Sequence, residues 1–70
     1  MERIAVSSRN VVSVGYEPDS CTLEVEFRSG TYQYFNVPPE IYNSLLEAGS
    51  KGSFVDQYIR KGGYPYAKVS

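Results

Sequence analysis

Residues 22–37 alternate between apolar and polar side chains on either side of Ser29-Gly30. A period of two is typical of β-strands with one buried face, and Ser29-Gly30 suits a two-residue hairpin loop in which Gly30 takes a positive φ. A hairpin closed at this loop pairs Phe27 with Tyr32 and Val25 with Tyr34, and directly opposed residues share a face. We therefore predict a hairpin whose inner face holds Leu23, Val25, Phe27, Tyr32 and Tyr34.

A third strand is predicted over Asn10 to Tyr16, where apolar residues again alternate. Glu17-Pro18-Asp19-Ser20 has turn chemistry and joins this strand to the hairpin. Closing the turn at Asp19-Ser20 puts three more side chains on the inner face: Val12, Val14 and Tyr16. The result is a three-stranded antiparallel β-meander with a half-polar second face, which suits a sheet open on one side.

Two helices are expected after the meander. The first begins at Val37-Pro38-Pro39, because proline is tolerated in a first helical turn, and Gly49 stops it. The second begins at Ser53, whose spacing to Asp56 resembles a capping box, and Gly62-Gly63 ends it. The predicted fold class is α+β, with the two short helices packed on one face of the sheet. Residues 1–63 form the domain, and residues 64–70 are a tyrosine-containing tail that is either disordered or adds a strand to a neighbouring chain.

The chain has 70 residues, one cysteine and no histidine. A domain of this size buries a modest core, and neither an internal disulfide nor a zinc site can staple it, so we expect a homo-oligomer and no bound metal or cofactor. No apolar run approaches membrane-spanning length, and the first residues are too polar for a signal peptide. A cytoplasmic protein without a membrane partner is the expectation.

Short motifs follow one another in a distinctive order: Val6-Ser7-Ser8, Gly15-Tyr16, Leu23 to Phe27, Gly30 to Tyr34, Val37-Pro38 and Ala48 to Gly52. This order resembles the KTSC domain, a short bacterial and viral module found alone or at the C-terminus of some lysyl-tRNA synthetases. The central Tyr-x-Tyr of that family is matched by Tyr32 and Tyr34, and its late Ile-Arg pair by Ile59-Arg60. The resemblance covers roughly residues 4–61, and the attachment to synthetases implies RNA binding by association.

Catalysis is not expected from these residues. Without histidine, the common Ser-His and Cys-His pairs cannot form. Glu24 and Glu26 share one strand face and resemble an acid/base pair, but a solvated face explains them better. Cys21 has no cation beside it in sequence, so a structural thiol is the better interpretation. We predict a protein that is not an enzyme.

Candidate ligand contacts come from basic and aromatic residues. Gly49 to Ser53 surrounds Lys51 with small residues and suits either a phosphate site or an ordinary capped turn. The candidate phosphate contacts are Arg9, Lys51, Gly52, Ser53, Arg60 and Lys61. Tyr32 and Tyr34 are expected in the core rather than as a stacking platform. The candidate aromatic or polar contacts are therefore Arg28, Gln33, Phe35, Tyr64 and Tyr66.

The net charge of −1 argues against an extended nucleic-acid surface, because phosphate neutralisation supplies most of such affinity. We predict a non-catalytic binding module for a small phosphate-bearing nucleotide or a short RNA segment. The alternative is a protein-interaction or self-assembly module that uses an open sheet edge and the C-terminal tail.

Overall fold

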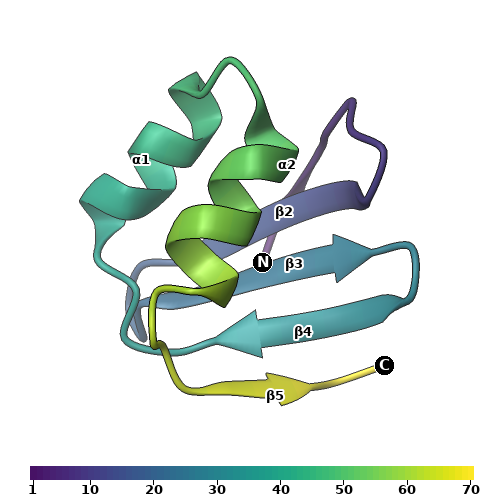
Figure 1. Cartoon of the computed structure of the whole chain (residues 1–70). Coiled ribbons are helices and arrows are strands. Elements are labelled where there is room, and N and C mark those ends of the chain that lie inside the picture. The colour runs from purple at the N-terminus through teal and green to yellow at the C-terminus, as the bar shows by residue number, and fades with distance from the viewer.

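A computed structural model describes residues 1–70, the whole chain, as one sheet covered by helices on one face (Figure 1). The elements in chain order are β1 (Arg3–Ala5), β2 (Val11–Glu17), β3 (Thr22–Phe27), β4 (Gly30–Tyr34), α1 (Pro39–Glu47), α2 (Lys51–Phe54), the π-helical turn η1 (Val55–Arg60) and β5 (Tyr66–Lys68). None of the helices is long and apolar enough to cross a bilayer.

The sheet has five strands rather than the three predicted, in the order β1-β2-β3-β4-β5 and antiparallel throughout. The two unpredicted strands are the edges, and each is three residues long with all of its residues exposed. Strands so short and exposed have no apolar alternation to reveal them. The tail forms β5 and pairs with β4 of its own chain. The prediction for this segment was either disorder or a strand added to a neighbouring chain.

The register of the central hairpin differs from the predicted one by two residues. Phe27 pairs with Gly30 and Val25 with Tyr32, so the loop is Arg28-Ser29 and not Ser29-Gly30. Gly30 has the positive φ expected, at +152°, but as the first residue of β4. A shift of two leaves every side chain on its predicted face, because side chains alternate with a period of two.

A β-bulge corrects the prediction for Val12. The register of β2 against β3 shifts between Val11 and Ser13, so the extra residue turns Val11 inward. Val11 is 1% exposed and belongs to the core, whereas Val12 is only half-buried. Alternation without a bulge put Val12 in that place.

The core lies between the inner face of the sheet and the helices. Its nine members are Val11, Val14, Leu23, Val25, Tyr34, Val37, Leu45, Val55 and Ile59. Burial of this apolar surface is the main force holding helices to sheet. Tyr16 extends the core by stacking on Tyr42, with ring centroids 4.9 Å apart, while its hydroxyl donates to the Val37 carbonyl.

The second helical segment starts earlier than predicted and changes its winding. Ser50, not Ser53, is the N-cap, because its Oγ accepts from the Ser53 backbone N–H at 3.4 Å. Beyond Phe54 the chain widens into η1, where the Lys61 N–H donates to the Asp56 carbonyl at 3.2 Å, five residues back. Wide turns of this kind are rare and often occur at functional sites.

Candidate ligand-binding site

A hollow of about 590 Å³ lies where the β3–β4 hairpin meets the end of η1 and β5. Four rings line it, from Phe27, Tyr32, Tyr34 and Tyr66. Its other lining residues are Asn10, Arg28, Ser29, Asp56, Arg60 and Lys61. This space, named the aromatic hollow below, therefore combines apolar rings with three cations and one carboxylate.

The strand period explains why the rings gather. Tyr32 and Tyr34 are two apart on β4 and point to the same face, and β5 pairing places Tyr66 opposite Tyr34. The Tyr66 ring lies 6.1 Å from that of Tyr32 and 5.7 Å from that of Tyr34. Phe27 meets Tyr32 edge-on at 5.8 Å. Tyr34 is nearly buried, whereas Tyr66 is 65% exposed, so the rings grade from core to surface.

The π-helical turn supplies the cations on the helix side. Asp56 forms ion pairs with both, with its Oδ1 3.5 Å from Arg60 Nη1 and its Oδ2 3.4 Å from Lys61 Nζ. The Arg60 guanidinium also lies 5.7 Å from the centre of the Phe27 ring. All three charged side chains are substantially exposed, and exposed ion pairs contribute only about 0–1 kcal/mol. An incoming anion can therefore compete with Asp56 for both cations.

Arg28 forms the opposite wall from the hairpin loop. Its Nε donates to the Arg9 carbonyl at 2.7 Å and its Nη2 to the Ser8 carbonyl at 3.3 Å. The Arg28 backbone N–H donates to the Asn10 carbonyl at 3.0 Å. These three bonds attach the loop before β2 to the hairpin.

Tyr34 lies where the rings meet the cations. Burial raises the pKa of its hydroxyl above the ordinary value, and the nearby Arg60 charge partly offsets that effect. The hydroxyl therefore stays protonated at neutral pH and is able to donate a hydrogen bond.

A second hollow of about 530 Å³ has no hydrophobic residue in its lining. It lies between the loop before β2 and the start of α2, and its cations are Arg9 and Lys51. Lys51 Nζ donates to the Ala48 carbonyl at 3.2 Å, while the Arg9 side chain makes no hydrogen bond or ion pair within the chain. Asn10 and Asp56 line both hollows, so this space, the polar hollow, adjoins the aromatic one.

Gly52 allows the two walls of the polar hollow to approach closely. A Cβ at this position would lie 2.5 Å from Ser8 Oγ, closer than Cβ atoms approach other atoms in real structures. Ser8 Oγ in turn accepts from the Asn10 and Val11 backbone N–H groups at 3.4 and 3.5 Å. The absence of a side chain on Gly52 is thus matched to the conformation of the loop before β2.

The structure divides the predicted contacts between the two hollows. Four of them line the aromatic hollow: Arg28, Arg60, Lys61 and Tyr66. Four others line the polar hollow: Arg9, Lys51, Gly52 and Ser53. Arg9 therefore lies in a different space from Arg60 and Lys61, although the two spaces adjoin. Three predicted contacts line neither hollow: Gln33, Phe35 and Tyr64.

Those three residues have other partners. Gln33 lies on the open face of the sheet, where its amide donates to Glu24. Phe35 follows the end of β4, and its backbone N–H donates to the Pro65 carbonyl at 2.8 Å. Tyr64 packs against the hydrophobic core. All three lie outside both hollows, and their role as ligand contacts stays a prediction.

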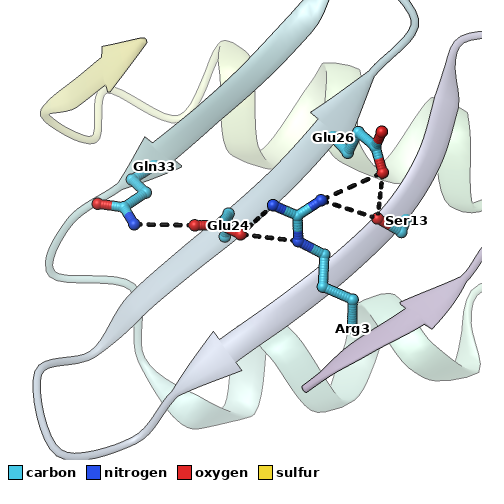
Figure 2. Close-up of polar contacts among 5 residues, drawn as sticks. All are labelled: Arg3, Ser13, Glu24, Glu26 and Gln33. Carbon is cyan, nitrogen blue, oxygen red and sulfur yellow. Dashed lines mark hydrogen bonds and ion pairs between the residues drawn. The ribbon is translucent and has the colours of Figure 1, made fainter. Parts of the chain in front are cut away.

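Figure 2 shows the open face on which the two glutamates lie. Arg3 from β1 reaches across β2, donating to Glu24 Oε2 at 2.7 Å and to Glu26 Oε1 at 3.1 Å. Ser13 Oγ donates to Glu26 at 2.8 Å, and Gln33 Nε2 to Glu24 at 2.8 Å. The bond from Gln33 and the charge of Arg3 outweigh burial and hold the pKa of Glu24 below its ordinary value. The network attaches β1 to the sheet and accounts for both carboxylates.

Sequence reasoning missed six residues of the aromatic hollow: Asn10, Phe27, Ser29, Tyr32, Tyr34 and Asp56. Tyr32 and Tyr34 do face the helices as predicted, but the helices leave one end of that face uncovered, so the same rings also border solvent. The sequence signal for this was present in the tyrosine content, because tyrosine is suited to a core margin. Nothing in the sequence indicated the π-helical turn that brings Asp56 to the hollow.

Comparison with known proteins places this architecture in a family. The KTSC domain family model matches residues 7–64. The crystal structure of a KTSC domain protein from Yersinia pestis superposes with a TM-score of 0.92 and 43% identity, covering 99% of this chain and 97% of that one.

Two relatives show the settings in which similar sequences occur. An uncharacterised protein from Stutzerimonas stutzeri is 43% identical over 70 residues, with 99% of each chain covered. A lysine–tRNA ligase from a Nostoc species is 43% identical over 56 residues, which are 79% of this chain and 10% of the ligase. The match over most of the chain and the shared fold show that this protein belongs to the KTSC domain family.

Proposed function

We propose that the aromatic hollow binds a nucleotide-type ligand, either a small phosphate-bearing nucleotide or a short RNA segment, without catalysis. The observation that carries the proposal is the placement of Arg28, Arg60 and Lys61 around a cluster of four aromatic rings. A nucleotide has the complementary parts, a flat base and an anionic phosphate.

The rings are suited to the base. Stacking of a base on an aromatic side chain contributes about 1–3 kcal/mol and tolerates any base, because each base has a π face. Tyr66 offers the most exposed ring, and Tyr32 lies beside it. The space of about 590 Å³ falls within the usual range of small-molecule sites.

The cations are suited to the phosphate. Three positive side chains face one carboxylate in the aromatic hollow, although the whole chain carries a net charge of −1. This local excess supports a ligand with few phosphates over a long polymer. The similar segment in a lysine–tRNA ligase, a protein named for its action on a tRNA, further supports a nucleotide-type ligand.

Titration of the full chain with mononucleotides and short RNA oligomers at low salt tests the proposal. Arg60→Gln should weaken binding by at least about tenfold, since a charge-assisted hydrogen bond contributes about 1.5–3 kcal/mol. Lys68→Gln is the matched control, because it removes one positive charge from a residue that lines neither hollow. Its affinity should stay within about twofold of the wild type. Absence of saturable binding to every probe would refute the proposal.

A further inference from the structure

We infer that the aromatic and polar hollows are two compartments of one site, and that its ligand is a dinucleotide unit carrying two phosphates. The inference rests on the proposed function and specifies its ligand. One nucleotide places its base in the aromatic hollow, and the next places its ribose and phosphate in the polar hollow.

Contiguity of the two spaces is the first support. Asn10 and Asp56 line both hollows, so the two spaces share a wall. The separating wall is held in place from both sides. Arg28 binds the carbonyls of Ser8 and Arg9, and Gly52 lets α2 approach Ser8 closely. Each compartment, at about 590 and 530 Å³, is large enough for one nucleotide.

The chemistry of the linings assigns the parts of the ligand. Four rings line one compartment, and no apolar side chain lines the other. A second base would therefore find no stacking partner, whereas a phosphate and a ribose would find two cations and several hydroxyl groups. Arg9 is the free cation of this compartment, because its side chain has no partner within the chain.

Asp56 sets the spacing between the phosphates. A carboxylate repels a phosphate placed directly above it, and the cations are distributed on its two sides, with Arg60 and Lys61 towards the rings and Arg9 and Lys51 away from them. Two phosphates flanking Asp56 satisfy this arrangement better than one. The ribose that links the two phosphates then lies over Asp56, where its hydroxyl groups can donate to the carboxylate.

The affinities of 5′-AMP, of the dinucleotide pApA and of an adenylate hexanucleotide for the full chain at low salt test the inference. The dinucleotide should bind at least tenfold more tightly than AMP, and the hexanucleotide no more than about threefold more tightly than the dinucleotide. Arg9→Gln should remove most of the gain for the dinucleotide while leaving AMP affinity within twofold. Arg60→Gln should weaken both ligands.

The outcomes separate the inference from the function on which it rests. Equal affinity for AMP and pApA would overturn the two-compartment site and leave nucleotide binding intact. An affinity that keeps climbing from two to six nucleotides would also overturn it, in favour of a longer strand surface. A failure to bind any of the three probes would refute the proposed function and the inference together. Because the Arg9 side chain has no internal partner, Arg9→Gln should keep the urea midpoint of the wild type, which excludes misfolding as the cause.

Discussion

The close approach of Gly52 to Ser8 can be tested by a double-mutant cycle. In Gly52→Ala the new methyl group would lie 2.5 Å from Ser8 Oγ, so the hydroxyl must rotate away. Rotation breaks the two long hydrogen bonds that Ser8 Oγ accepts from Asn10 and Val11. Their loss costs about 1–2 kcal/mol, while alanine in a helix gains about 0.5–1 kcal/mol over glycine. Gly52→Ala alone should therefore destabilise the fold by about 1 kcal/mol.

Ser8→Ala removes the same two hydrogen bonds directly and should cost about 1–2 kcal/mol. In the double variant the clash is gone, because the next atom, Ser8 Cβ, lies 3.6 Å from the new methyl group, an ordinary contact distance. The bonds are then lost only once and the helical gain is kept. The double variant should be no less stable than Ser8→Ala, which corresponds to a coupling energy of about 1–2 kcal/mol.

Urea unfolding followed by far-UV circular dichroism measures all four corners of the cycle. Gly49→Ala is the matched control, because a Cβ there meets nothing within 4 Å. It should change stability by less than about 0.5 kcal/mol. Additivity of the Gly52 and Ser8 substitutions within about 0.3 kcal/mol would refute the close approach and, with it, the rigid wall between the hollows.

Two further predictions concern the sheet. Val11→Ala should destabilise the protein by about 1–3 kcal/mol and Val12→Ala by less than half as much, because the bulge turns only Val11 into the core. Equal losses of stability in urea unfolding would contradict the bulge. The pKa of Glu24 in the folded protein is held below the ordinary value of 4.5, so Glu24 is protonated at a higher pH in the unfolded chain than in the folded one. The stability that Glu24 contributes is therefore complete above the unfolded pKa and is lost as the pH falls through the folded pKa. Glu24→Gln should therefore flatten the decline of the urea midpoint between about pH 6 and about pH 3, and parallel declines in the two proteins would contradict the role of the network.

The side-chain faces of the three central strands were largely predictable, and the register was not. Alternation identifies a face, and a shift of two residues leaves the face unchanged. The loop residue that decides the register is Arg28, whose side chain binds the carbonyls of Ser8 and Arg9. That tertiary contact holds Arg28 in the turn, and a loop chosen from local turn preference alone omits it.

Several residues of the candidate site were predictable from the sequence, but how they come together in space was not. Arg60, Lys61 and Tyr66 were identified as contacts, but the geometry that unites them depends on β5 pairing with β4 and on the π-helical turn. Both features arise from tertiary packing of segments with weak local signals. Gln33, in contrast, was identified as a contact but lies on the open face of the sheet, where its amide donates to Glu24.

The pairing of β5 with β4 also bears on the order in which the chain folds. The first four strands are neighbours both in sequence and in space, whereas β4 and β5 enclose the whole helical segment. Closing that long loop costs about 2 kcal/mol more entropy than closing a hairpin turn, so the last strand should dock late. Tyr66 arrives with it. Completion of the aromatic hollow would then coincide with the final step of folding, and a chain whose terminal strand has frayed would keep its core but lose an outer ring of the hollow.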